Sequence, residues 1–204
     1  CYGLAKTPTK ENHKINTKYP YALSKYQGEQ AAFHWSKVYN LPVNSIRIFN
    51  AYGTRSRTSG AYGAVFGVFL KQKLENKPYT VVGDGTQKRD FVYVTDVANA
   101  FYKSAIIKKS NLIFNLGAGN PQSINYLIEL LKGKKVFVPK RPGEPDCTWA
   151  DISFISKTLD WYPIVSFEDG VNKIIDDINY WKNAPLWNVD NISAATATWV
   201  KYMS

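Results

Sequence analysis

Residues 19–29 read YPYALSKYQGE, and they open a predicted helix that runs from about residue 21 to residue 40. Pro20 suits the first turn of a helix, because its missing N–H has no partner there in any case. Tyr21 and Lys25 are four residues apart, so their side chains fall on one face of this helix. The sequence therefore predicts a phenol and an ammonium group held side by side.

Such a pair has a chemical use. A free tyrosine has a pKa of roughly 10 and is a poor base at neutral pH. A neighbouring cation favours the phenolate, and a phenol placed in this way can exchange a proton with a sugar hydroxyl. By itself the pair is a weak indication, because this chain is rich in both residue types and the alternative is an exposed pair without chemistry.

Segments with strand character alternate with helical segments along the chain. Apolar runs predict strands at 43–49, 79–82, 91–94, 112–117 and 136–138. Helices are predicted near 21–40, 63–76, 95–106, 124–131, 151–160, 167–183 and 190–203. Thr95 and Ser123 are the predicted N-caps of two of them. This alternation is typical of the α/β class, in which polar loops such as residues 50–55 face a ligand at the carboxyl ends of strands.

The composition limits the class of protein. Only two cysteines, Cys1 and Cys147, occur in 204 residues, which argues against a disulfide scaffold and favours a reducing, cytoplasmic setting. Neither cysteine stands in a metal-ligand spacing, so no metal site is expected. No apolar run approaches the roughly 18 residues of a membrane-spanning helix, and residues 1–6 lack the apolar core of a signal peptide.

The formal net charge of +10 suits an anionic ligand or partner. The lysines are spread along the chain, whereas a nucleic-acid-binding protein usually gathers them on one segment or face. The alternative is a lysine-rich surface with no specific ligand. We therefore expect neither a nucleic-acid partner nor a membrane partner.

Four segments follow one another in a set order. They are Tyr21-x-x-x-Lys25; RIFNAYG at 47–53; VGDGTQKRDFVYVTDV at 82–97; and RPGE at 141–144 with WAD at 149–151. This set resembles the extended short-chain dehydrogenase/reductase superfamily. Within it, the set is most similar to the NAD-dependent nucleotide-sugar epimerase/dehydratase family, of the UDP-glucose 4-epimerase kind. The resemblance covers nearly the whole chain.

The resemblance implies roles for residues beside the nicotinamide. In that family the Tyr and Lys of Tyr-x-x-x-Lys form the acid/base pair and also contact the cofactor, which implies both roles for Tyr21 and Lys25. The backbone of Phe49 would line the nicotinamide of NAD. Asn50 would contact the nucleotide-sugar.

The same resemblance implies substrate-binding roles for Arg89, Arg141 and Glu144. The two arginines would bind the diphosphate of the substrate, and Glu144 would accept a hydrogen bond from a ribose hydroxyl. Guanidinium groups suit this task, because they are permanently charged and present a forked set of donors. The alternative for either arginine is a salt bridge within the protein.

Other charged or aromatic residues of these segments have a structural interpretation. Arg47 is expected to support the sheet without touching a ligand. Asp90 and Asp96 are expected to pair with neighbouring arginines or backbone groups, and Trp149 can equally serve in packing. The Gly117-Ala118-Gly119 segment is interpreted as a turn, because it lacks the third glycine of a phosphate-binding loop.

The implied domain organisation is a Rossmann-type domain joined to a smaller one. Residues 1–60 would be the C-terminal portion of the NAD-binding domain, and residues 61–204 mainly a nucleotide-sugar-binding domain. A stretch at about 91–118 would return to the Rossmann-type sheet. The chain opens inside what looks like the end of a strand, so we expect the N-terminal dinucleotide-binding half to precede it.

The resemblance implies a nucleotide-sugar 4-epimerase of the UDP-hexose class. It would act by transient oxidation at C4 with tightly bound NAD and would be a homodimer when intact. A nucleotide-sugar 4,6-dehydratase or a UDP-glucuronate decarboxylase begins with the same oxidation, so both remain alternatives. A third alternative is a truncated, non-catalytic chain, and this chain by itself is expected to be inactive.

Overall fold

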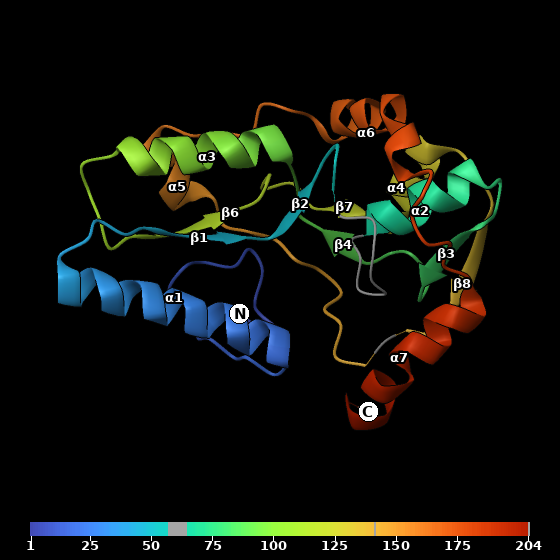
Figure 1. Cartoon of the computed structure of the whole chain (residues 1–204), viewed down its shortest axis with the longest axis horizontal. Helices are drawn as coiled ribbons and strands as arrows, with labels where there is room; N and C mark the ends of the chain where they lie inside the picture. The colour runs from blue at the N-terminus through green and yellow to red at the C-terminus, as the bar shows by residue number, and fades with distance from the viewer. Residues whose placement is uncertain (57–64, 141, 204) are drawn as a thin grey trace. The chain divides into compact units, whose positions relative to one another are not determined.

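The computed structural model describes residues 1–56, 65–140 and 142–203 (Figure 1). These residues form two compact units, each assembled from three chain segments. Unit 1 consists of Cys1–Ala51, Asp90–Pro121 and Cys147–Ile164, and unit 2 of Tyr52–Arg89, Gln122–Asp146 and Val165–Ser204. The sequence predicted a first domain at residues 1–60 with a return at about 91–118. Unit 1 also contains Cys147–Ile164, which was not part of that prediction.

Unit 1 is built around a parallel pair of strands. Strand β1 (Ser45–Ile48) pairs with β6 (Ile113–Leu116), with Ser45 opposite Ile113 and Ile48 opposite Leu116. Helix α1 (Pro20–Tyr39) covers one side of this pair, and α3 (Val94–Ile106) and α5 (Ser153–Leu159) cover the other (Figure 1). Strands β2 (Asn50–Tyr52) and β5 (Phe91–Tyr93) form a second pair.

The core of unit 1 lies between β6 and the helices α3 and α5. Its buried members are Val92, Val97, Ala100, Phe114, Leu116, Ile155, Leu159 and Trp161. The indole N–H of Trp161 donates to the backbone oxygen of Asp96 at 3.1 Å, and the Asp96 carboxylate accepts from the backbone N–H of Ile164. Asp96 is thus a partner of backbone groups, as expected from the sequence.

Unit 2 has a parallel pair and a short antiparallel pair. Strand β3 (Tyr79–Val82) pairs in parallel with β8 (Lys135–Val138), and β4 (Lys88–Arg89) pairs in antiparallel fashion with β7 (Gln122–Ser123). The remaining elements are α2 (Val65–Leu74), α4 (Ile124–Leu131), α6 (Phe167–Asp176), the 3₁₀ helix η1 (Ile178–Trp181) and α7 (Val189–Met203).

Aromatic rings make much of the unit 2 core. The Tyr52 ring stacks on Phe66 with centroids 4.8 Å apart, and Phe167 packs against both rings. Gly170 on α6 leaves the space that the Tyr52 hydroxyl fills, since a Cβ at that position would lie 2.1 Å from the hydroxyl oxygen. Close packing of this kind leaves little room for any added atom.

The α/β prediction is confirmed, and most predicted elements appear within a few residues of their expected bounds. Ser123 caps α4 as predicted, because its hydroxyl accepts from the backbone N–H of Tyr126 at 3.0 Å. The prediction for Thr95 is wrong: α3 begins at Val94 after the capping position Tyr93. Residues 50–52, predicted as loop, form β2. Among the described helices, none combines the length and apolar composition that a bilayer crossing requires.

Candidate functional site

Tyr21 and Lys25 lie together on the exposed side of α1. The Lys25 ammonium nitrogen is 5.5 Å from the centroid of the Tyr21 ring. The Tyr21 side chain is 74% exposed. The helical spacing thus brings the phenol and the cation to one face, where both are accessible.

A buried ion pair joins the same helix to the sheet. The Glu29 carboxylate accepts from Nη2 and Nε of Arg47 at 2.7 and 2.9 Å, and from the Ser45 hydroxyl at 2.7 Å. Only 7% of the Glu29 side chain and 10% of the Arg47 side chain are exposed. Arg47 therefore supports the sheet, as expected, and also anchors α1 to it.

The electrostatics of this pair favour the charged forms. Burial by itself would raise the pKa of Glu29, but the hydrogen bonds from Arg47 and Ser45 outweigh it and hold that pKa below its ordinary value. Arg47 Nη1 also donates to the Tyr2 hydroxyl at 2.7 Å, which in turn donates to the Asn115 side chain on β6. The ion pair is thus part of a network that spans both strands.

Phe49 and Asn50 stand at the C-terminal end of β1. The Phe49 backbone N–H donates to the oxygen of Leu116 at 2.9 Å, and its ring lies 6.2 Å from that of Tyr2. The Asn50 side-chain oxygen accepts from the Thr148 hydroxyl at 2.7 Å. These contacts fix both residues at the strand end where α/β proteins bind ligands.

Asp90 closes the glycine-containing turn that follows β6. It is fully buried, and its carboxylate accepts from the backbone N–H groups of Ala118, Gly119 and Ala150 at 2.7, 3.0 and 2.8 Å. Burial raises the pKa of Asp90 although these groups donate to it. A Cβ at Gly117 would lie 2.3 Å from the carboxylate. A protein carboxylate thus occupies the N–H groups that a phosphate loop would offer.

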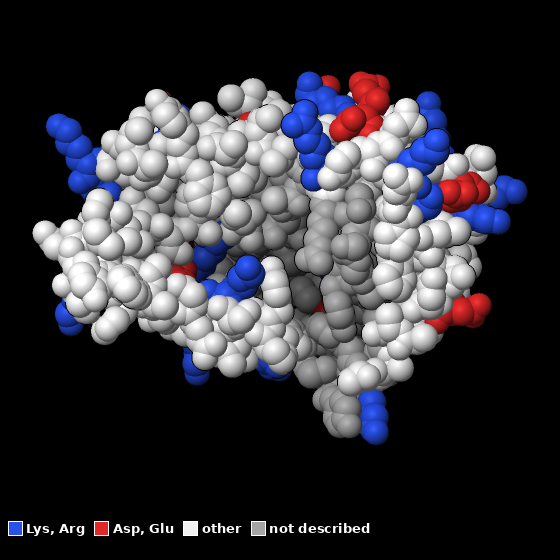
Figure 2. Space-filling view, viewed as in Figure 1, with Lys and Arg blue, Asp and Glu red and all other residues white. Residues whose placement is uncertain are grey.

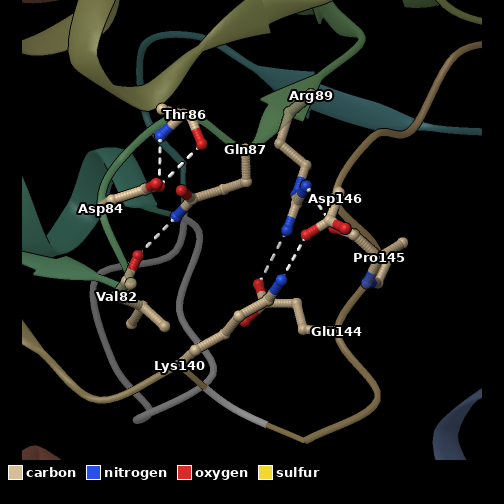
Figure 3. A pocket seen from close by; sticks show the side chains of 10 residues that line it. Val82, Asp84, Thr86, Gln87, Arg89, Lys140, Glu144, Pro145 and Asp146 are labelled. Carbon is tan, nitrogen blue, oxygen red and sulfur yellow. Dashed lines mark hydrogen bonds and ion pairs between the residues drawn. The ribbon is translucent and has the colours of Figure 1, made fainter.

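Unit 2 holds a pocket of about 230 Å³ beside the β3–β4 turn (Figure 3). It is lined by Val82, Gly83, Asp84, Thr86, Gln87, Arg89, Lys140, Glu144, Pro145 and Asp146. Ligand pockets usually measure roughly 300–1,000 Å³, so this one suits part of a ligand, such as a diphosphate.

Arg89 reaches into this pocket from β4. Its Nη2 donates to Glu144 at 2.8 Å, and its Nη1 donates to the backbone oxygens of Pro145 and Lys88, each at 2.9 Å. Figure 3 shows the guanidinium turned toward the loop that carries Glu144 and Pro145. Because an arginine has five N–H donors, these three bonds leave capacity for a further anion. Lys140 lines the same pocket and pairs with Asp146.

The structure brings the predicted site residues together in groups. Tyr21 and Lys25 meet on α1, and Phe49 and Asn50 lie at the end of β1, all within unit 1. Arg89 and Glu144 meet in the unit 2 pocket, where they form an ion pair, and the ribose contact of Glu144 stays a prediction. Arg141 lies outside the described residues.

Two supporting residues were not predicted from the sequence. Glu29 follows Lys25 by four residues, and this spacing could have been noticed as a third member of the row on α1. Thr148, which donates to Asn50, carries no signal in the sequence, because the two residues are 98 positions apart.

Comparison with known protein families matches residues 1–117, more than half of the chain, to the NAD dependent epimerase/dehydratase family. The chain belongs to this family. The matched region holds Tyr21, Lys25, Phe49, Asn50 and Arg89, so most of the predicted site falls inside it.

Members of the family resemble the chain over most of its length. A putative UDP-glucose 4-epimerase from Methanocaldococcus jannaschii is 34% identical over 86% of the chain. A UDP-glucuronate 4-epimerase from Thermodesulfobacterium geofontis is 33% identical over 94% of it. The chain spans 57% of the length of each of these two relatives.

A solved structure shows the same likeness in three dimensions. It is the UDP-glucuronic acid 4-epimerase from Bacillus cereus in complex with UDP-glucuronic acid and NAD, which matches with a TM-score of 0.78 and 34% identity. The match covers 89% of this chain and 58% of that one. The fold of this chain is therefore that of a Rossmann-type epimerase over the shared region.

Proposed function

We propose that the full-length protein is a nucleotide-sugar 4-epimerase that acts on a UDP-hexose with NAD as cofactor. The observation that carries this proposal is the Tyr21–Lys25 pair, in which the cation lies 5.5 Å from the centre of an accessible phenol ring. The family match and the 4-epimerase relatives support it.

The residues of this chain fit one end of the cofactor. Tyr21 and Lys25 present a hydroxyl and an ammonium group on an open helix face, which suits the ribose beside the nicotinamide. Phe49 would line the nicotinamide ring. The pyrophosphate of NAD needs N–H groups that are not already bonded. In the turn at residues 117–119, two backbone N–H groups already donate to the Asp90 carboxylate. When bound, NAD would supply a reversible acceptor for the C4 hydride.

Tyr21 would move the proton in both directions. As a phenolate it takes the proton of the sugar 4-hydroxyl, and the hydroxyl oxygen becomes a carbonyl oxygen as C4 loses a hydride. Lys25 places a positive charge beside the Tyr21 ring. After the 4-keto sugar has rotated and C4 has regained the hydride on its other face, Tyr21 returns the proton to the C4 oxygen, so the side chain ends each cycle in its starting state.

Arg89 would bind the diphosphate of the substrate, together with Arg141. The pocket around Arg89 is large enough for a diphosphate, and Lys140 adds a second cation to its lining. Glu144, which accepts from Arg89, would turn to a ribose hydroxyl or share the guanidinium. Binding energy gained at the diphosphate is remote from C4 and helps to hold the sugar in place.

The proposal includes no nucleic acid. On the face shown in Figure 2, the described Lys and Arg side chains of each unit stand apart from one another or beside acidic residues. A cytoplasmic setting is part of the proposal, because Cys1 and Cys147 are not joined by a disulfide in the part of the chain that the structure describes. A homodimer is also part of the proposal. Helix α1 exposes the large side chains of Trp35, Val38 and Tyr39, which could pack against a second copy.

The decisive experiment replaces Tyr21 by Phe in the full-length protein and measures turnover of UDP-glucose, UDP-N-acetylglucosamine and UDP-glucuronic acid. Loss of the acid/base group should lower kcat by about 10²–10⁴-fold. Tyr26→Phe is the matched control, because it removes a phenol hydroxyl from the same helix and should retain the wild-type rate.

The products distinguish the possible reactions. A 4-epimerase interconverts two sugars that differ only at C4. A 4,6-dehydratase releases a 4-keto-6-deoxy sugar, and a decarboxylase releases carbon dioxide. A Tyr21→Phe enzyme with near-normal turnover would exclude Tyr21 as the acid/base group.

A further inference from the structure

Helix α1 contacts the rest of unit 1 through two polar side chains, Glu29 and Ser36, as well as through partly buried apolar ones. Ser36 is its one buried residue among those described. Several of its large apolar side chains are exposed, among them Leu23, Trp35, Val38 and Tyr39 at 42–59%. The partly buried face of α1 combines Tyr26 and Phe33 with the polar Glu29. Specific polar contacts on this face give the orientation of α1 a defined direction.

Two polar contacts have this role. Near the C-terminus of α1, the Ser36 hydroxyl bonds to the oxygen of Leu41 at 2.6 Å and to the side chain of Asn111 at 2.8 Å. In the middle, Glu29 bonds to Arg47 and Ser45 on β1. Of these two contacts, the one at Glu29 lies nearer to Tyr21 and Lys25.

Glu29 continues the row that Tyr21 and Lys25 begin. Residues four apart lie above one another on a helix, and each such step turns the row by about 40°. The row thus passes from the exposed Tyr21, through Lys25, to Glu29, whose side chain is only 7% exposed. A rotation of α1 about its axis would carry all three side chains together.

Arg47 is held in place by hydrogen bonds to residues other than Glu29. Its Nη1 donates to the Tyr2 hydroxyl at 2.7 Å and to the backbone oxygen of Glu11 at 3.1 Å. Tyr2 donates to Asn115 on β6 at 2.7 Å, and the backbone N–H of Asn115 donates to Glu11. The forked Arg47–Glu29 contact fixes direction as well as distance, because two N–H groups meet two carboxylate oxygens.

We propose that Glu29, held by Arg47 and Ser45, is a positioning residue that sets the rotation of α1 and so the direction in which Tyr21 and Lys25 face. The proposal rests on the acid/base role proposed above for Tyr21. Its rival is a pair that contributes to stability alone.

The test uses Glu29→Gln in the full-length protein, with kcat and KM measured well below the unfolding temperature. An amide cannot accept from both N–H groups and the Ser45 hydroxyl as a carboxylate does. We expect kcat to fall about 10- to 100-fold, because a small misplacement of a catalytic group lowers the rate by about this much. We expect KM to stay within about twofold, because substrate binding does not depend on Glu29. Glu29→Asp, which keeps the charge and shortens the reach, should recover part of kcat.

Two controls separate position from stability and from charge. Val171 is fully buried in unit 2, so Val171→Ala opens a cavity there and lowers stability through a residue outside unit 1. Glu75→Gln removes the same charge from the Lys71–Glu75 pair, whose atoms are 2.6 Å apart. Both variants should keep the wild-type kcat.

A signal that needs no turnover completes the test. With ring-labelled tyrosine, the NMR signal of Tyr21 is assigned by its loss in Tyr21→Phe. We expect it to shift in Glu29→Gln and to stay in place in both controls, because a rotation of α1 would move the Tyr21 ring relative to the rest of unit 1. If Glu29→Gln does not fold, Ser45→Ala removes one bond to the same carboxylate and should produce smaller changes of the same kind.

The outcomes distinguish the two proposals. A wild-type rate in Tyr21→Phe overturns the proposed function, whatever Glu29 does. An inactive Tyr21→Phe with an unchanged kcat and an unshifted Tyr21 signal in Glu29→Gln overturns only the positioning role. A lowered melting temperature with normal kcat also overturns the positioning role, because a pair that acts on stability alone predicts that result.

Discussion

Individual charged side chains in this protein are paired before any ligand arrives. Arg89 bonds to Glu144, Arg47 to Glu29, and Asp90 to backbone N–H groups. A buried charge without a partner is costly, so these bonds are the default state of the folded chain. A ligand that binds Arg89 must therefore offer at least as good an acceptor, and a diphosphate does so because it carries several charged oxygens.

Arg89→Ala in the full-length protein should therefore weaken binding of the nucleotide. Loss of a charge-assisted bond typically costs about 1.5–3 kcal/mol, so the affinity for UDP should fall about 10- to 150-fold by isothermal titration calorimetry. Lys88→Ala is the control: Lys88 is the exposed neighbour of Arg89, carries the same charge and does not line the pocket. Equal losses in the two variants would mean that general charge, rather than Arg89, attracts the ligand.

At the scale of the element, the glycines of helices α1 and α6 have opposite surroundings: one lies against a packed side chain and the other faces open space. Gly170 on α6 makes room for the Tyr52 hydroxyl, which would lie 2.1 Å from an added Cβ. Tyr52 cannot move away easily, because it is 4% exposed and stacked on Phe66. Gly28 on α1 has no atom within 4 Å of such a Cβ.

The two alanine substitutions should therefore change stability in opposite directions. Gly170→Ala overpacks the core of unit 2 and should lower the free energy of unfolding by about 1–3 kcal/mol. Gly28→Ala should raise it by about 0.5–1 kcal/mol, because alanine loses less backbone entropy in a helix. Denaturant unfolding of both variants measures the difference. A neutral Gly170→Ala would show that the Tyr52 ring can shift at little cost.

At the scale of the whole molecule, the chain passes between the two units five times, after residues 51, 89, 121, 146 and 164. Two residues of the proposed site lie beside these passages in the sequence: Asn50 precedes the first, and Arg89 is the last residue before the second. The residues expected at the cofactor, Tyr21, Lys25 and Phe49, all belong to unit 1. They would contact only one end of a dinucleotide.

NAD should therefore stabilise the full-length protein far more than residues 1–204 alone. A ligand at 100 times its Kd stabilises a protein by about 2.7 kcal/mol, which a thermal melt detects as a higher Tm. The shorter chain should show little change at the same NAD concentration, because it offers no free glycine-rich turn for the pyrophosphate in the part that the structure describes. An equal rise in Tm for both would contradict this account of the cofactor site.

Local patterns were enough to predict much of the fold and one part of the site. The alternation of apolar strands and helical segments predicted the α/β class, and the four-residue spacing predicted that Tyr21 and Lys25 share a helix face. The Ser123 cap was also predicted from local sequence, because a capping hydroxyl bonds to a backbone N–H only three residues away. These features depend on residues within a few positions of one another, where helix and strand geometry alone determines which side chains meet.

Only the tertiary structure decided the partners of the charged residues. Arg47 meets Glu29 at 18 positions' separation, Asp90 meets Ala118 at 28, and Arg89 meets Glu144 at 55. Sequence reasoning assigned Glu144 to a ribose and left the partners of Arg47 and Asp90 unnamed. Such contacts depend on how strands and loops pack at distances of a few ångströms. The spacing of residues along the sequence does not determine that packing.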